Sequence, residues 1–255
     1  ASDVYKRQAL HWAKKHSGKI GKLRAYAPLT VLYLLCLGFV MLGKDLGTAM
    51  IVLFIGFVAF LLGGYPGKVL AAFASLGIIG IVGLIAYSPN RLNRVLAAYQ
   101  ECSGTDAQKV CYQSIHAKYA LAEGGLFGVG LGNSREKWNY LPEAHNDFIF
   151  AIICEELGLV GATIIMVMFA LLVIRGYWIA LHARDRFGSL LAVGVTTQIA
   201  LQVFLNIAVV TNLIPNTGIS LPFFSYGGTA LLMQMAEMGI VLSISRDLPA
   251  GRVGG

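Results

Sequence analysis

Long apolar stretches constrain this chain more than any other feature of its sequence. A transmembrane helix needs about 20 mostly apolar residues, and six stretches come close to that length. They cover residues 27–43, 47–64, 69–88, 148–174, 189–211 and 228–245. Only 13% of the residues are charged, against about 25% in soluble domains, and the stretches show no strand-like alternation. We therefore predict an all-α, polytopic transmembrane helix bundle with six spans.

Lysine and arginine residues indicate how these spans are oriented. They gather in the segment 9–26, at Lys68 and in the loop 175–188, which lie on one side if the spans alternate, whereas the loop 212–227 on the other side has none. Cytoplasmic loops are enriched in Lys and Arg, so the basic side is predicted to be cytoplasmic and the loop 89–147 external. We interpret the net charge of +7 as this signal plus attraction to anionic lipid, not as nucleic-acid binding.

The beginning of the chain has an unusual composition. Residues 1–8 have no signal-peptide character and resemble a translated sequencing adapter, so we expect them not to be native. The short apolar segment 9–13 resembles the end of a helix whose beginning is missing. We therefore expect a fragment with one membrane domain over residues 9–255 and no second, soluble domain.

The external loop between the third and fourth spans is too long to be a simple connection. Residues 108–122 have the spacing of an amphipathic helix. Cys102 and Cys111 would form a disulfide in an oxidising exterior, but two free thiols are the equal alternative, since spacing alone does not establish the geometry.

A Gly-rich segment, residues 124–132, follows in the same loop and leads into Ser134, Arg135 and Lys137. Glycine amides beside basic side chains suit a phosphate or pyrophosphate. The alternative is a solvated basic loop without a ligand. A dinucleotide site is excluded, because no strand–helix–strand unit surrounds these glycines.

Three ionisable residues, Glu143, His145 and Asp147, alternate just before the apolar stretch 148–174. Asp147 could be a general base at the membrane mouth. Alternatively, Asn146 or Asp147 is simply the N-cap of the following helix. Glu143 and His145 could be cap neighbours, metal ligands or substrate contacts, and the carboxylates of Glu143 and Asp147 could reach one divalent ion.

Further polar residues lie inside the predicted spans. Glu155 and Glu156 would be about 12 Å deep, where a charge is costly, so both should face a cavity, pair or be protonated. Four others suit interhelical hydrogen bonds or a polar groove: Gln202, Asn206, Gln234 and Glu237.

Loops at the ends of the spans offer further candidates. The loop 212–227 is apolar but broken by proline and glycine, and irregular backbone near membrane depth is tolerated where it is buried or lines a cavity. We therefore interpret it as a cavity wall. Asp45 could cap the helix that follows it, and Gly227 and Gly228 would allow close helix packing.

Several motifs together resemble the SEDS family of shape, elongation, division and sporulation proteins, the FtsW, RodA and SpoVE group. They are Asp-Leu-Gly-Thr-Ala at 45–49, Gly-Val-Gly-Leu-Gly-Asn-Ser-Arg-Glu-Lys at 128–137, Leu-Pro-Glu-Ala-His-Asn-Asp-Phe-Ile-Phe at 141–150, Glu-Glu-Leu-Gly at 155–158, and Leu-Pro-Phe-Phe-Ser-Tyr-Gly-Gly at 221–228. The resemblance covers about residues 9–246 and is strongest to the division branch. Lys44 and Asn146 depart from the family pattern, which has Pro and Thr there.

The resemblance implies a protein of ten spans, of which six are visible here. It further implies a peptidoglycan glycosyltransferase that polymerises lipid II into β-1,4 glycan outside the cytoplasmic membrane, with inversion. Asp147 matches the family's essential aspartate, which is proposed to deprotonate the acceptor 4-hydroxyl. We expect substrate contacts at Glu143, His145, Lys137, Arg135, Ser134, Asn206, Thr217 and Ser225. We expect structural or groove roles at Asp45, Glu155, Glu156, Gly227 and Gly228.

The resemblance also implies partners and cofactors. The partners are lipid II, the growing lipid-linked glycan, membrane lipid, a class B penicillin-binding protein and other divisome proteins. No tightly bound cofactor is expected, while Mg²⁺ or Mn²⁺ is plausible. Two alternative functions are a lipid II transporter, whose polar path would use Glu155, Glu156 and Glu237, and a non-catalytic divisome scaffold.

Overall fold

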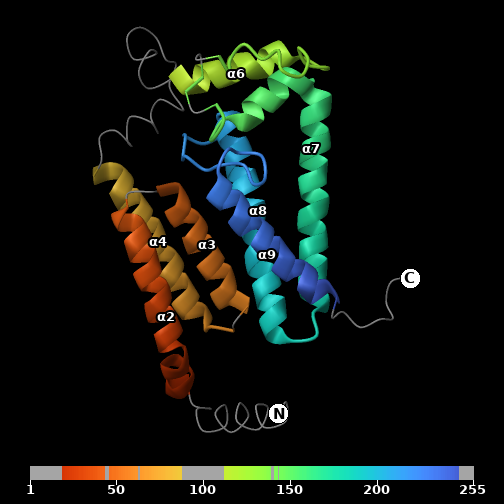
Figure 1. The fold of residues 1–255 in the computed structure, drawn as a ribbon. Coiled ribbons are helices and arrows are strands. Elements are labelled where there is room, and N and C mark those ends of the chain that lie inside the picture. The colour runs from red at the N-terminus through yellow and green to blue at the C-terminus, as the bar shows by residue number, and fades with distance from the viewer. Residues whose placement is uncertain are drawn as a thin grey trace. The chain divides into compact units, whose positions relative to one another are not determined.

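The structure is a computed structural model that describes residues 19–43, 46–62, 64–87, 112–138, 141–142 and 144–246. These residues form helices and no strand, which confirms the all-α prediction (Figure 1). The helices are α2 (Lys19–Leu42), α3 (Leu46–Leu62), α4 (Gly67–Tyr87), α6 (Tyr112–Gly124), α7 (Ile149–His182), α8 (Arg186–Val210) and α9 (Gly228–Arg246). Asp45, Glu143, residues 1–8 and the cysteines of the expected disulfide, Cys102 and Cys111, lie outside the described residues.

Each predicted span coincides with a helix. By length and composition, α7, α8 and α9 can each cross a membrane. The helices α2, α3 and α4 contain shorter apolar stretches, at Thr30–Leu42, Gly47–Leu62 and Gly67–Gly83. The exposed faces of these helices are rich in Leu, Ile, Val and Phe, as expected for surfaces that contact lipid rather than water.

The chain divides into two compact units, residues 1–52 and 53–255. In the first, the hydroxyl of Tyr33 on α2 donates to the carbonyl of Val52 on α3 (2.7 Å). In the second, the ring of Phe60 packs on Tyr65 in the turn after α3 and on Phe73 of α4. The functional candidates described below all belong to the second unit.

Helices α7, α8 and α9 pack around the main apolar core of the second unit. A side chain at Gly176 of α7 would collide with Thr196 of α8, so the two helices approach closely there. Next to this contact, the hydroxyls of Tyr177 and Thr197 are hydrogen-bonded (2.9 Å). Small and hydroxyl-bearing residues thus hold α7 against α8, as is usual between membrane helices.

Helix α6, over Tyr112–Gly124, confirms a helix in the region predicted at 108–122, within the part that the structure describes; the residues that it buries are the small ones, Ala117, Ala120 and Gly124. Figure 1 shows α6 lying across the ends of α7 and α8, both of which it contacts. Its His116 Nδ1 lies 2.7 Å from Glu136 Oε2, and its Gln113 accepts a hydrogen bond from Asn216 (2.9 Å). Helix α6 therefore contacts both the segment 134–138 and the loop 212–227 through polar side chains.

Helix α7 differs from the predicted continuous span over 148–174. Gly158 has φ 68° and ψ −171°, which interrupts the helix, and Figure 1 shows the bend. The interruption separates a short part, residues 149–157, from a long part, residues 159–182. The prediction of one uninterrupted span is wrong, and so is the inference that Glu155 and Glu156 lie two turns inside it, because both precede the break.

Candidate functional site

The segment 144–148 leads into the short part of α7 and carries Asp147. The N-cap position is occupied by Phe148, and its side chain makes no capping hydrogen bond. The hypothesis that Asn146 or Asp147 is the N-cap residue is therefore wrong, because the helix begins after Phe148. Asp147 is half-buried, whereas His145 is exposed.

Three consecutive carbonyl groups of this segment are each held by another part of the chain. The amide of Tyr226 donates to His145 O (2.9 Å). The hydroxyl of Ser225 donates to Asn146 O (2.7 Å). The side-chain amide of Asn206 donates to Asp147 O (2.8 Å). The backbone around Asp147 is thus fixed through these three carbonyl groups.

The residues that hold the segment are themselves tied to the loop 212–227. Asn206, which is fully buried, also donates to the carbonyl of Ile219 (2.8 Å). Ser225 Oγ also accepts from the amide of Leu221 (2.7 Å). These contacts assign Asn206 and Ser225 to positioning the backbone, whereas the sequence predicted them as substrate contacts.

The carboxylate of Asp147 lies beside the loop 212–227. A Cβ atom at Gly218 would lie 3.7 Å from Asp147 Oδ2, and Gly218 itself has φ +72°. The neighbouring Thr217 has a buried hydroxyl with no hydrogen-bond partner among the described residues. A half-buried carboxylate on a fixed backbone can accept a proton from a bound hydroxyl group.

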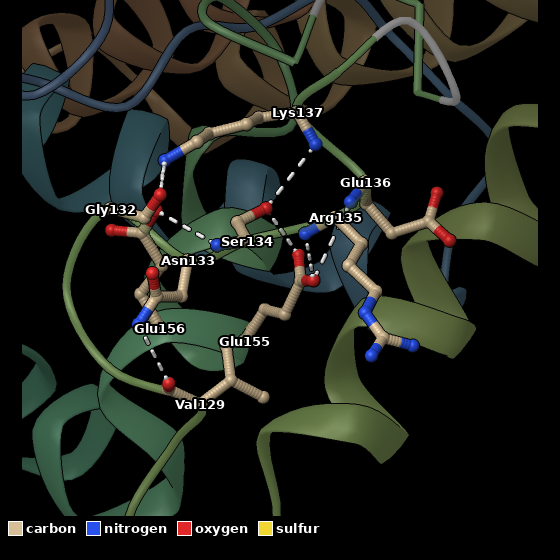
Figure 2. Close-up of polar contacts among 9 residues, drawn as sticks. All are labelled: Val129, Gly132, Asn133, Ser134, Arg135, Glu136, Lys137, Glu155 and Glu156. Atoms are coloured by element: carbon tan, nitrogen blue, oxygen red, sulfur yellow. Dashed lines mark hydrogen bonds and ion pairs between the residues drawn. The ribbon is translucent and has the colours of Figure 1, made fainter.

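Glu155 and Glu156 bind the segment 134–137 (Figure 2). Glu155 is fully buried and accepts from the Ser134 hydroxyl (2.5 Å) and the Arg135 amide (2.7 Å). Lys137 Nζ pairs with Glu156 Oε1 (2.7 Å) and donates to Gly132 O (2.6 Å). Of the three options predicted for these glutamates, Glu156 therefore shows pairing, with Lys137, whereas Glu155 is held by hydrogen bonds from a hydroxyl and from backbone amides.

These contacts change the interpretation of Ser134, Arg135 and Lys137. Their hydroxyl, backbone amide and ammonium groups already have carboxylate partners within the chain, so they do not form an open anion site. Figure 2 shows the guanidinium of Arg135 pointing away from Glu155, and this side chain is exposed. Arg135 is therefore the member of the trio whose charged group stays available to a substrate or a lipid.

The Gly-rich segment 124–132 packs directly on the break in α7. Four backbone hydrogen bonds join them: Val129 N to Glu155 O (3.0 Å), Gly130 N to Glu156 O (3.0 Å), Leu159 N to Gly125 O (2.9 Å) and Val160 N to Leu126 O (3.1 Å). The segment thus satisfies backbone groups around the break that a continuous helix would pair internally. Its amides at Val129 and Gly130 are occupied, so these groups are not the phosphate donors that the sequence suggested.

Two further contacts involve polar side chains of α8 and α9. Gln234 of α9 accepts from the amide of Phe223 (2.9 Å), whose φ of 65° is unusual for a non-glycine residue. Gln198 of α8 donates to both carboxylate oxygens of Glu237 on α9 (3.1 Å each). The bond between α8 and α9 confirms the interhelical hydrogen bond predicted for Glu237, whereas Gln234 binds a loop amide and Gln198 was not predicted.

From the sequence, Glu143 and Asp147 could together bind one divalent ion. Glu143 lies outside the described residues, and the described part of the chain contains no group of three or more His, Cys, Asp and Glu side chains placed to hold an ion. Gly227 and Gly228 lie at the start of α9. The prediction that they allow close helix packing is wrong, because among the described residues a Cβ atom at Gly228 would meet nothing within 4 Å and one at Gly227 would meet only the Cβ atom of Ala230 at 3.5 Å.

Replacing Glu155 with glutamine should destabilise the protein by about 2 kcal/mol, because hydrogen bonds to a charged group are stronger than those to an amide. Glu156→Gln is the matched control. Its carboxylate is more exposed and forms one ion pair, so we expect a loss of about 1 kcal/mol or less. Thermal unfolding midpoints of both purified variants in detergent test this. Equal losses for the two variants would show that Glu155 is not the main anchor of the segment.

Comparison with known proteins places the chain in a family. A family model described as "Cell cycle protein", for FtsW, RodA and SpoVE, matches residues 7–249. The chain is 40% identical over 241 residues to the "Probable peptidoglycan glycosyltransferase FtsW" of Bacillus subtilis, covering 92% of the chain and 60% of that protein. It is 43% identical over 213 residues to "Stage V sporulation protein E" of the same organism, covering 81% of the chain and 56% of that protein.

Solved structures agree. One, from a study of "polymerization and crosslinking by a peptidoglycan synthase complex", matches with a TM-score of 0.69 and 27% identity over 94% of this chain and 67% of that one. A crystal structure of a mutant of the rod shape determining protein RodA from Thermus thermophilus matches with a TM-score of 0.57 and 28% identity, over 89% of this chain and 58% of that one. The chain spans about 60% of the length of the first curated relative. The match to the family model over nearly all of its residues shows that the chain belongs to the FtsW, RodA and SpoVE family of cell cycle proteins.

Proposed function

We propose that this chain carries the catalytic centre of a peptidoglycan glycosyltransferase that polymerises lipid II during cell division. The observation that carries the proposal is the placement of Asp147: its carboxylate is half-buried, and the carbonyls of residues 145–147 are held by three hydrogen bonds from α8 and the loop 212–227. Similarity to relatives named peptidoglycan glycosyltransferase supports the type of reaction.

In the proposed reaction, Asp147 accepts the proton of the acceptor sugar's 4-hydroxyl while that oxygen attacks the anomeric carbon of the donor. The new carbon–oxygen bond forms as the bond from the anomeric carbon to the lipid pyrophosphate breaks. Attack from the opposite face inverts the anomeric centre and gives a β-1,4 linkage. A positioned base of this kind contributes about 10²- to 10⁴-fold in rate.

The other site residues divide into two groups under this proposal. His145, Arg135 and Thr217 are the described side chains that contact substrate, because their polar groups are exposed or unpaired within the described structure. Glu143 remains a predicted substrate contact. Mg²⁺ or Mn²⁺ would depend on substrate phosphates for most of its ligands, since the described residues offer no cluster of metal-binding side chains.

We further propose a multi-pass protein of the bacterial cytoplasmic membrane with Asp147 on the outer side. Asp147 precedes α7, whereas Arg184 and Arg186 lie at the opposite end of that helix. Basic residues mark the cytoplasmic end of a span, which supports an external Asp147. A class B penicillin-binding protein is the proposed partner, supported by the similarity to a peptidoglycan synthase complex that polymerises and crosslinks. Other divisome proteins would join them.

Incubating the purified protein with labelled lipid II in detergent micelles, with and without a class B penicillin-binding protein, tests the proposed function. Micelles have no two sides, so a transporter has no detectable activity in this assay and a scaffold adds none of its own. We expect a ladder of glycan products on a gel, removed by a β-1,4-specific muramidase. Unreacted lipid II in the presence of a folded, monodisperse complex would favour the transporter or the scaffold.

A further inference from the structure

The turn formed by residues 126–131, which is not part of α7, exposes several large apolar side chains. Leu126 is 62% exposed, Phe127 81% and Leu131 76%. Trp138, a few residues later, is 72% exposed. Isolated exposed apolar residues are common on protein surfaces, but several large ones on one short segment indicate a surface that contacts something apolar.

We propose that this turn, which we call the apolar turn (126–131), inserts into the interfacial region of the lipid bilayer and anchors the segment 124–138 there. Gly125, just before the turn, and Leu126, within it, accept backbone hydrogen bonds from Leu159 and Val160, respectively. These are the first residues of the long part of α7, and their side chains are exposed. Since the long part of α7 is the apolar span, the apolar turn lies where that span meets the membrane boundary.

The backbone of the apolar turn suits such a position. Polar backbone groups that enter a membrane need internal partners. The amides of Gly128, Val129 and Gly130 donate within the chain, and the carbonyls of Gly125 and Leu126 accept within it. The turn therefore satisfies these polar groups internally while presenting apolar side chains outward, the reverse of an ordinary water-facing loop.

The flanking side chains also fit a bilayer rather than a protein surface. Tryptophan concentrates at membrane–water interfaces because one edge of its ring is apolar and the other carries a polar N–H group. Arg135 is exposed, and a guanidinium beside an apolar anchor suits lipid phosphates. Within 13 residues, the chain thus combines an apolar turn that suits the lipid chains, an exposed Trp138 that suits the interface and an exposed Arg135 that suits the headgroups.

Depth-dependent fluorescence quenching tests this inference independently of the proposed enzymatic function. The native tryptophans, Trp12, Trp138 and Trp178, are replaced by phenylalanine, and Phe127→Trp is introduced as the reporter. The protein is placed in nanodiscs that contain phospholipid with a nitroxide at a shallow acyl position. We expect the nitroxide lipid to remove most of the reporter's fluorescence and aqueous iodide to have little effect.

Matched variants in the same background calibrate the measurement. Leu171→Trp, on the exposed face of the long part of α7, should be quenched by a deep nitroxide. Asn133→Trp, at an exposed polar position of the same loop, should be quenched by iodide. Leu131→Trp provides a second reporter if Phe127→Trp does not fold.

Two results would overturn the inference. Quenching of the reporters by iodide and not by the nitroxide lipid would place the apolar turn in water. Protection from both quenchers would mean that protein, either another part of the polypeptide or a partner, covers the turn in place of lipid.

Discussion

Replacing Gly128 with alanine should destabilise the protein by about 3 kcal/mol or more, beyond the usual cost of overpacking a core. A Cβ atom at this position would collide with the backbone carbonyl of Glu156 and approach the amide of Gly158. Backbone atoms cannot give way like a flexible side chain. The Gly-rich segment would therefore have to separate from the break in α7, with the loss of the hydrogen bonds from Val129 and Gly130 to that break.

Gly132→Ala provides the control for this prediction. Gly132 also has a positive φ, +82°, but a Cβ atom there meets nothing within 4 Å. It should carry only the strain of a left-handed alanine, about 1–2 kcal/mol. Thermal unfolding in detergent compares the two variants. If both melt at the same temperature, close packing at the break does not matter and positive φ alone explains the choice of glycine at 128.

Gly158→Ala should resemble Gly128→Ala, because each glycine faces the other's backbone across the break. The φ and ψ of Gly158, 68° and −171°, also belong to a region that is essentially restricted to glycine. Asp147 precedes the short part of α7 that this contact supports. Disruption of the contact should therefore shift Asp147 as well as lower stability.

The helices could be predicted from the sequence because each depends on a continuous apolar stretch, a local property. The break in α7 could not, because its partner is the Gly-rich segment some 30 residues earlier in the chain. An isolated glycine in an apolar helix is normally tolerated. Only the contact between Gly158 and Gly128 shows that the helix stops and restarts there.

The sequence predicted which residues belong to the candidate site better than it predicted what each of them does. Asn206 and Ser225 were predicted to contact substrate, but the groups to which they donate are backbone carbonyls, and a sequence does not show which carbonyl a side chain meets. Similarly, Ser134 and Lys137 suggested an anion site, and the anions that they bind in the structure are the carboxylates of Glu155 and Glu156. Polar and charged groups that are distant in the sequence can bind each other in the fold, and the spacing of residues along the chain does not show this.

Replacing Asp147 with asparagine should lower the rate of glycan polymerisation by about 10²- to 10⁴-fold, the contribution of a positioned general base. The fold should persist, because the hydrogen bonds from Tyr226, Ser225 and Asn206 reach backbone carbonyls that asparagine keeps. Asparagine also has nearly the same volume and tolerates positions near a helix start as well as aspartate does. What it lacks is a carboxylate that can accept a proton at neutral pH.

Ser225→Ala is the useful companion variant. It removes the hydroxyl that joins Asn146 O to the amide of Leu221 but leaves the carboxylate of Asp147 in place. We expect a smaller loss of polymerisation rate than for Asp147→Asn, together with a measurable loss of stability, about 1–3 kcal/mol for unsatisfied groups. The two variants thus distinguish the loss of the proposed base from the loss of a hydrogen bond that holds the backbone next to it.

The initial rate of glycan formation from lipid II by Asp147→Asn, measured beside the unaltered protein with the same partner, tests whether Asp147 is the catalytic base. We expect an unfolding midpoint close to that of the unaltered protein and almost no polymer. A stable Asp147→Asn protein that polymerises lipid II at the unaltered rate would contradict the assignment of Asp147 as the catalytic base.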